Sequence, residues 1–242
     1  MIIRLRYEAA SLLSAPWHAL RTDGLSAFPL TLASTALVGL FAVIQHSALG
    51  SWVVEHVADV YQALPLPLIL LRLPLSMFAP APDLPAWGAM LQTLAVIGLS
   101  ETHLGRLRTL VTAVCVNGLT TVSASLMMLA AHHLSIGSPQ LDRYEPDTGP
   151  STVVVALSVC VALTRRAYAV LTVTAAAMAA EATALPNLAG REHLVALALG
   201  AASYLLGPSP SVPISPAPPV ATASSPRPPA QDEVRPRRGS RP

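Results

Sequence analysis

The chain has 242 residues, of which 52% are hydrophobic and only 12% are charged, whereas an ordinary soluble domain carries roughly 25% charged residues. The apolar residues gather in runs of about 17 to 25, the length that crosses a hydrocarbon core, and a soluble fold would be left with too little polar surface. The formal net charge of +2 comes from arginines in loops and tail, so it does not indicate nucleic-acid binding. We therefore expect an integral membrane protein whose main partner is the lipid bilayer.

The N-terminal segment, residues 1–24, mixes apolar side chains such as Ile2, Ile3 and Trp17 with arginines. This pattern predicts a cytoplasmic or interfacial segment, either an amphipathic helix lying on the membrane surface or a partly ordered lead-in. The two interpretations are equally compatible with the sequence.

Six membrane spans are predicted within a transmembrane domain at residues 25–207. They cover approximately residues 27–46, 86–100, 109–131, 151–164, 167–184 and 190–207. The long connection at 47–84 is interrupted by Pro65, Pro67, Arg72 and Pro74. This suits a segment half-sunk in the interface, or re-entrant, better than a regular crossing, although a seventh crossing stays open.

Arginines between the spans predict the orientation, because arginine-rich short loops remain in the cytoplasm. They lie in the N-terminal segment, after the second span, after the fourth span and in the tail. This alternation requires an even number of spans with both termini in the cytoplasm, and hence a multi-pass protein of the cell membrane. The tail, residues 208–242, is rich in proline and arginine and poor in large apolar residues, so we expect it to be disordered.

A serine opens the fourth span, in the stretch "DTGPST". The sixth span runs in the same direction and begins near His193, so Ser151 and His193 are expected at similar depth near the outer face. A serine and a histidine can form a nucleophile–base pair without an acid. Ala196 and Gly200 give the sixth span a small-residue face that permits close approach. The alternatives are that Ser151 is only a helix N-cap and His193 only an interfacial histidine.

Glu101 lies at the end of the second span, in "GLSETHLGRLR". An acid at a span end is costly unless it is paired, and Arg106 or Arg108 could pair with it across the short turn. Because this turn is expected on the cytoplasmic side, far from Ser151, we interpret Glu101 as a structural residue that ties the second and third spans together. No cofactor or metal is predicted, since the histidines lack ligand spacing with acids or cysteines.

Taken in order, these stretches resemble the rhomboid family of intramembrane serine proteases, and most of all its rhomboid-like branch common in actinobacteria. The likeness covers about residues 20–207 and implies an all-α, rhomboid-like bundle of about six transmembrane helices. It also implies that Ser151, with Gly149 two residues before it, matches the nucleophile motif and that His193 matches the base on the sixth helix. The residues that match the family's turn after the second helix are Glu101, Gly105 and Arg106.

The chain departs from the family pattern at two places. Active rhomboids usually follow the serine with glycine, and Thr152 stands there in this chain. They also hold the oxyanion with a histidine and an asparagine early in the second helix. Here that region, "PAWGAMLQTLAV", offers only Trp87 and Gln92 as side-chain donors, and losing one oxyanion donor typically costs about a hundred- to a thousandfold in rate.

Three functions therefore remain open at the level of the sequence. The first is an intramembrane serine protease with a Ser151–His193 dyad. The second is a non-catalytic rhomboid relative that binds the transmembrane helices of other membrane proteins. A small-solute transporter is a distant third, which would require inverted repeats and helices broken near the midplane.

Overall fold

The computed structural model describes most of the chain before the tail. The described residues are 2–81, 85–133, 143–144, 146–147, 149–185 and 187–207, with the backbone alone at 131–133. The tail predicted at 208–242 lies outside them.

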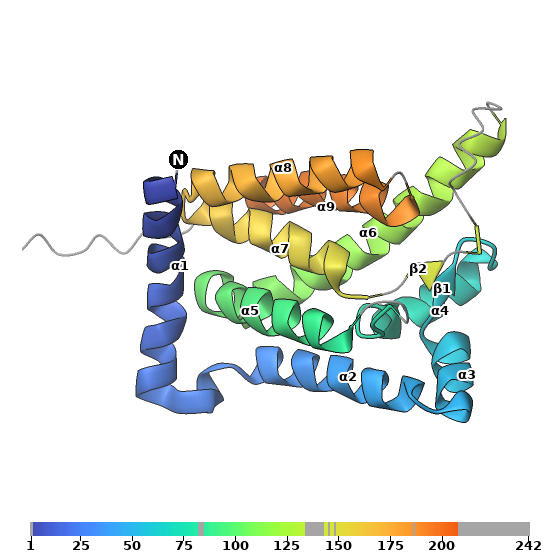
Figure 1. Ribbon diagram of the computed structural model, residues 1–242, viewed down its shortest axis with the longest axis horizontal. Coiled ribbons are helices and arrows are strands. Elements are labelled where there is room, and N and C mark those ends of the chain that lie inside the picture. The colour runs from blue at the N-terminus through green and yellow to red at the C-terminus, as the bar shows by residue number, and fades with distance from the viewer. Residues whose placement is uncertain are drawn as a thin grey trace, which may run out of the picture. The chain divides into compact units, whose positions relative to one another are not determined.

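The described chain is mostly helical, as the sequence predicted (Figure 1). Its elements in chain order are α1 (Ile2–Asp23), the short 3-10 helix η1 (Gly24–Ala27), α2 (Pro29–Gln45), α3 (Ala48–Val57), β1 (Val60–Tyr61), α4 (Leu66–Ser76), α5 (Ala86–Leu104), α6 (Arg106–His133), β2 (Pro146–Asp147), α7 (Ser151–Thr164), α8 (Tyr168–Ala184) and α9 (Leu188–Leu206). Each of the six predicted spans thus corresponds to one helix, in the order α2, α5, α6, α7, α8 and α9.

The bounds of the second and third spans were predicted too short. The predicted spans end near residue 100 and begin again near residue 109, whereas α5 continues to Leu104 and α6 begins at Arg106. Charged residues near a span end do not stop a helix by themselves. The break falls at Gly105, whose backbone φ of 82° is a conformation that glycine adopts without steric cost.

Fewer helices meet a strict membrane-span criterion than the sequence suggested. Among the described residues, α6 is long and apolar enough over Arg106–Ala130, and α1–η1 with α2 qualifies only as a single span bent by 67°. The apolar helices α7 and α8 have only 14 and 17 residues, and α9 carries Arg191 and Glu192 in its first turns. Only 33% of the apolar window of α6 is buried, so much of its apolar surface faces outward.

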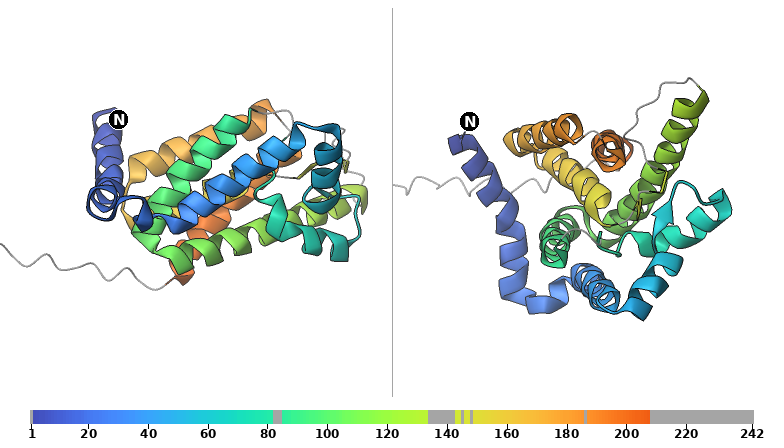
Figure 2. Two further views of the ribbon diagram at one scale, coloured as in Figure 1. Left: turned by 90° about the horizontal axis from the view of Figure 1, so that it is seen from below. Right: turned by 45° about the vertical axis from the view of Figure 1, so that its right-hand side comes forward.

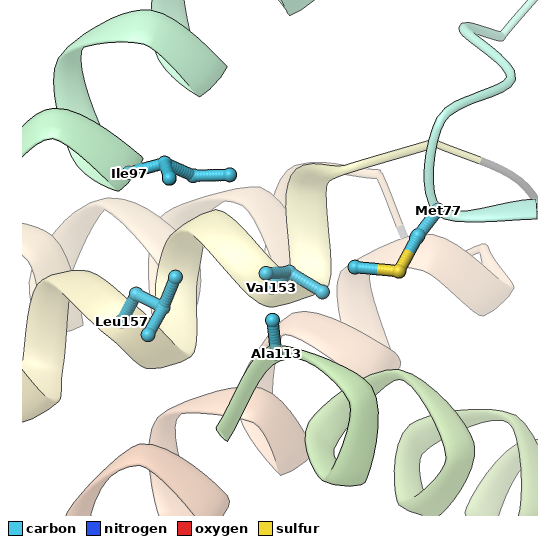
Figure 3. Packing of buried hydrophobic residues seen from close by; sticks show 5 residues of the cluster. All are labelled: Met77, Ile97, Ala113, Val153 and Leu157. Carbon is cyan, nitrogen blue, oxygen red and sulfur yellow. The ribbon is translucent and has the colours of Figure 1, made fainter. Parts of the chain in front are cut away.

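Helix α7 is the central helix of the bundle (Figure 2). It packs against α5, α6, α8 and α9, and nine of its 14 residues are buried. A helix that is apolar on all sides is stable only when neighbours surround it. Its side chains join one core cluster with residues of α5, of α6 and of the segment that follows α4 (Figure 3); the cluster contains Met77, Ile97, Ala113, Val153 and Leu157.

Within the connection predicted at 47–84, the described residues 47–81 contain two short helices and one strand. α3 and α4 have 10 and 11 residues, which at about 1.5 Å per residue is too short to cross a hydrocarbon core of about 30 Å. Asn117 of α6 anchors α4, because its side-chain amide donates to the Leu73 carbonyl at 2.9 Å. β1 pairs antiparallel with β2, Val60 opposite Asp147, and so ties this connection to the segment that leads into α7.

Candidate functional site

Ser151 is the first residue of α7, and the turn before it has a defined geometry. Gly149 has a backbone φ of 106°, a value that residues other than glycine rarely adopt. Its N–H donates to the Ser76 carbonyl at 2.9 Å. The N-cap position belongs to Pro150, and no side chain of the described residues caps this helix end. The alternative that Ser151 serves as an N-cap is therefore wrong, since its hydroxyl makes no capping hydrogen bond.

Two cavities meet at Ser151. The larger, of about 290 Å³, lies between the N-terminal half of α5, the residues that follow α4, and the start of α7; its lining includes Pro80, Ala81, Gln92 and Gly149. The smaller, of about 30 Å³, lies between the start of α7 and the first turns of α9, where Glu192 lines it. Ser151 therefore borders a groove lined mostly by small and apolar residues on one side and faces α9 on the other.

The two predicted oxyanion donors are placed differently. Gln92 lines the larger cavity together with Ser151. Trp87 is 70% exposed and is not among the residues that line either cavity at Ser151. The two residues are five positions apart in α5, about 140° around an axis with 3.6 residues per turn, so only Gln92 is directed toward the serine.

Helices α7 and α9 pack closely and run in the same direction. Gly200 of α9 lies against the backbone of Ala156, because a Cβ atom built on Gly200 would stand 2.9 Å from the Ala156 Cα, and Ala196 belongs to the same buried cluster. Ser151 precedes Ala156 by five residues and His193 precedes Gly200 by seven. At about 1.5 Å of rise per residue, the two levels along the bundle differ by only about 3 Å.

His193 is buried, at 7% exposure, and one ring nitrogen has a defined partner. Its Nδ1 lies 3.0 Å from Oε2 of Glu181 on α8. An ionised carboxylate only accepts hydrogen bonds, so Nδ1 carries the proton, and in the neutral form of the ring Nε2 carries the lone pair. This Nε2 is shielded from solvent and has no hydrogen-bond partner among the described residues. The ring therefore has the tautomer that a general base requires.

Sequence reasoning assigned no role to Glu181. It is the single acid within the apolar run of the fifth span, 12 residues before His193. Its position near the end of the fifth span could have indicated this role, because the short connection between α8 and α9 keeps the end of α8 and the start of α9 at one end of the bundle. An acid near the end of one span and a histidine near the start of the next are therefore placed to meet.

The structure does not join the serine and the histidine by a direct hydrogen bond. Among the described residues, the hydrogen bonds of His193 include Glu181 but not Ser151. Ser151 and Glu192 line one cavity, and His193 follows Glu192 in α9. The Ser151 hydroxyl and the His193 imidazole thus lie on neighbouring helices at a similar level, but they are not hydrogen-bonded to each other in this structure.

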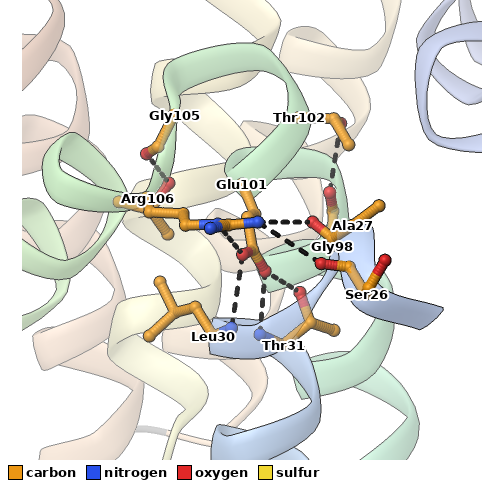
Figure 4. Close-up of polar contacts among 10 residues, drawn as sticks. Ser26, Ala27, Leu30, Thr31, Gly98, Glu101, Thr102, Gly105 and Arg106 are labelled. Atoms are coloured by element: carbon orange, nitrogen blue, oxygen red, sulfur yellow. Dashed lines mark hydrogen bonds and ion pairs between the residues drawn. The ribbon is translucent and has the colours of Figure 1, made fainter. Parts of the chain in front are cut away.

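Glu101 forms a second polar centre at the other end of the bundle (Figure 4). Its Oε1 accepts from Arg106 Nε at 3.0 Å, which is one of the two ion pairs that the sequence suggested. Its Oε2 accepts from the Thr31 backbone N–H at 2.9 Å and from the Thr31 hydroxyl at 2.7 Å. Glu101 therefore also holds the start of α2, a contact that the sequence did not predict. Gly105 provides the turn that brings Arg106 back to it.

Neither a metal site nor a similar protein adds to this description. Among the described residues, no three His, Cys, Asp or Glu side chains are arranged to hold a metal ion. Comparison of the chain with protein-family models, with characterised proteins and with solved structures found no match in any of the three.

Proposed function

We propose that this chain is a multi-pass, rhomboid-like membrane protein that works as an intramembrane serine protease. In this proposal Ser151 is the nucleophile, His193 the general base, and Glu181 the residue that orients the base. The observation that carries the proposal is the buried imidazole, whose Nδ1 is held by a carboxylate at 3.0 Å and whose Nε2 has no described partner, at the level of a serine that opens the neighbouring helix.

The distribution of arginines supports the membrane placement. Of the ten arginines among the described residues, seven lie in α1, at the start of α6 or directly after α7, the end of the bundle that α1 crosses (Figure 1). This end faces the cytoplasm by the positive-inside rule, and Ser151 lies toward the outer face. The 14 residues of α7 extend about 21 Å, less than the about 30 Å of a hydrocarbon core, which leaves room for α7 to begin below the outer surface.

The chemistry follows from these positions. Ser151 Oγ attacks the carbonyl carbon of a peptide bond while Nε2 of His193 takes the hydroxyl proton. The oxyanion of the tetrahedral intermediate is met by the Gln92 side-chain amide and by the free N–H groups at the start of α7. The proton on Nε2 then passes to the leaving amine, and water releases the acyl group from Ser151 by the reverse sequence. Glu181 keeps the Nδ1 proton in place throughout.

The larger cavity supports a peptide substrate. Its lining is mostly small or proline residues, including Pro80, Ala81, Gly88 and Ala89, which leave room for a backbone beside Ser151. A locally unwound segment of a transmembrane helix fits such a groove, since small side chains allow its backbone to approach the serine.

A second candidate is a non-catalytic relative that binds transmembrane helices. Two observations favour it: Ser151 has no hydrogen bond to His193 among the described residues, and Thr152, buried at 7% exposure, occupies the place that glycine has in active rhomboids. A transporter has less support, because each of α5, α6, α7, α8 and α9 is one continuous helix.

An activity probe that labels activated serines separates the candidates. The full chain in detergent is compared with Ser151→Ala and His193→Ala, and with Ser158→Ala as a matched control on the same helix. The protease predicts labelling that both site variants abolish and the control retains. If the wild type stays unlabelled but captures transmembrane helices, the protease would be rejected in favour of the non-catalytic helix-binding protein.

A further inference from the structure

A cavity lined by arginines lies between α1 and the turn from α7 to α8. Its volume is about 260 Å³, and its polar lining includes Arg4, Tyr7, Ser11, Arg165 and Arg166. We infer that this cavity binds the phosphate group of an anionic lipid headgroup in the cytoplasmic leaflet. The inference rests on the membrane placement proposed above but not on the protease chemistry.

The one acid in the cavity lining is already engaged. The carboxylate of Glu8 accepts the backbone N–H groups of Ala169 and Val170 at 2.7 and 3.1 Å and pairs with Arg4 Nε at 2.9 Å. Glu8 therefore caps the start of α8 and offsets only one of the three cations. The cavity keeps an excess of positive charge, which a phosphodiester would offset with charge-assisted hydrogen bonds.

The backbone at Arg166 is a second, independent observation. Arg166 has a φ of 55°, the left-handed conformation that usually falls to glycine at a helix C-terminus. The hydrogen bonds of that helix end are present, because the Ala167 N–H donates to the Ala162 carbonyl at 2.8 Å. Glycine would form the same turn with less strain, so an arginine there places a cation beside Arg4 at a cost in folding free energy.

The surroundings of the cavity fit a lipid better than a free phosphate ion. α1 lies across the arginine-rich end of the bundle (Figure 1), and it exposes large apolar side chains beside the cavity, with Ile2 at 72%, Ile3 at 86% and Leu13 at 58% exposure. Apolar side chains of an interfacial helix enter the acyl region while cations stay at headgroup level. A lipid meets both features, because its phosphate lies next to its acyl chains.

The test uses the delipidated full chain in neutral detergent. Binding of phosphatidylglycerol and of phosphatidylcholine is measured by native mass spectrometry for wild type, R165Q/R166Q, and the matched double variant R6Q/R21Q. The control removes the same charge from exposed arginines of α1 that do not line the cavity. We expect phosphatidylglycerol affinity to fall about tenfold or more in R165Q/R166Q and less than about threefold in the control.

Two further measurements keep the outcome decisive. Arg166→Gly removes the side chain and relieves the backbone, so it should unfold at the wild-type temperature or higher and still lose lipid affinity. Equal losses in the two double variants, or wild-type affinity in R165Q/R166Q, would overturn the site. Suppose that inorganic phosphate binds the wild type and that phosphatidylglycerol binds no more tightly than phosphatidylcholine. This result would overturn the lipid as the ligand. Release of the wild-type chain from membranes by alkaline carbonate would overturn the membrane placement itself.

Discussion

Carboxylates in three different settings determine the local chemistry of this chain. Glu181 is partly exposed and faces a histidine; Glu101 is buried and shared between an arginine and a helix start; Asp59 is buried between α3 and β1 without a partner for its Oδ1 among the described residues. In the proposed function the first orients the base. The second links α5 to the start of α2, and the pKa of the third is raised to about 6.

Replacing Glu181 by Gln keeps a hydrogen-bond acceptor for Nδ1 but removes the negative charge that stabilises the imidazolium. We expect the rate of serine-probe labelling to fall by about a hundredfold or more, with a shift in its pH profile, while Glu181→Asp restores part of the rate. The control Glu55→Gln changes an exposed acid of α3. An unchanged rate and pH profile in Glu181→Gln would rule out the orienting role.

Asp59 predicts a pH dependence of stability. Burial raises the pKa of its carboxyl from 3.8 to about 6, the nearby Glu55 adds to the rise, and Arg72 opposes it. The folded state therefore binds the proton more tightly than the unfolded state, so this stabilisation is complete below about pH 4 and is lost as the pH rises through about 6.

Asp59→Asn should accordingly unfold with less dependence on pH between about 4 and 6 and should be more stable than wild type at pH 7, by about 1 kcal/mol after solvent screening. Thermal unfolding in detergent across this pH range measures both effects. A variant that is less stable than wild type at pH 7 would show that the charged form is favoured in the folded chain.

The starts of α2 and α8 are capped by side chains from other elements. Neither α2 nor α8 has a side-chain cap of its own. Glu101 of α5 accepts the first N–H groups of α2, and Glu8 of α1 accepts those of α8. A carboxylate at a helix N-terminus is favoured by the unpaired N–H groups and by the helix dipole. These two acids therefore fix how α5 meets α2 and how α1 meets α8.

The α7–α9 contact predicts a position-specific cost for one methyl group. In Gly200→Ala the new Cβ meets the Ala156 carbonyl oxygen and lies 2.9 Å from its Cα, so the helices must separate and we expect a loss of about 1–3 kcal/mol. Gly118→Ala in α6 is the matched control, because its Cβ meets only a Leu73 methyl at 3.9 Å. Equilibrium unfolding of both variants tests this; equal stability of the two would contradict the close packing.

The whole molecule is polarised between an arginine-rich end crossed by α1 and an end that carries Ser151. The orientation proposed above places the first end in the cytoplasm. It predicts that Arg143→Cys is labelled by a membrane-impermeant maleimide added to intact cells, while Arg21→Cys is labelled only after lysis, both with the two native cysteines replaced by serine. The reverse pattern would invert the topology, and labelling of both in intact cells would contradict the odd number of crossings proposed between residues 21 and 143.

The sequence by itself determined the helical class and the approximate location of α2 and of α5 to α9, including both ends of α7, because the length of an apolar run and its flanking turn residues are local properties. It also singled out Ser151 and His193, and it paired Glu101 with either Arg106 or Arg108, of which the structure shows Arg106. Only the tertiary structure decided that Gln92 rather than Trp87 shares a cavity with Ser151, that Glu181 holds His193, and that the described residues 47–81 contain two short helices. These outcomes depend on the rotation and register of helices distant in the chain, which are set by how side chains such as Ala156 and Gly200 pack together.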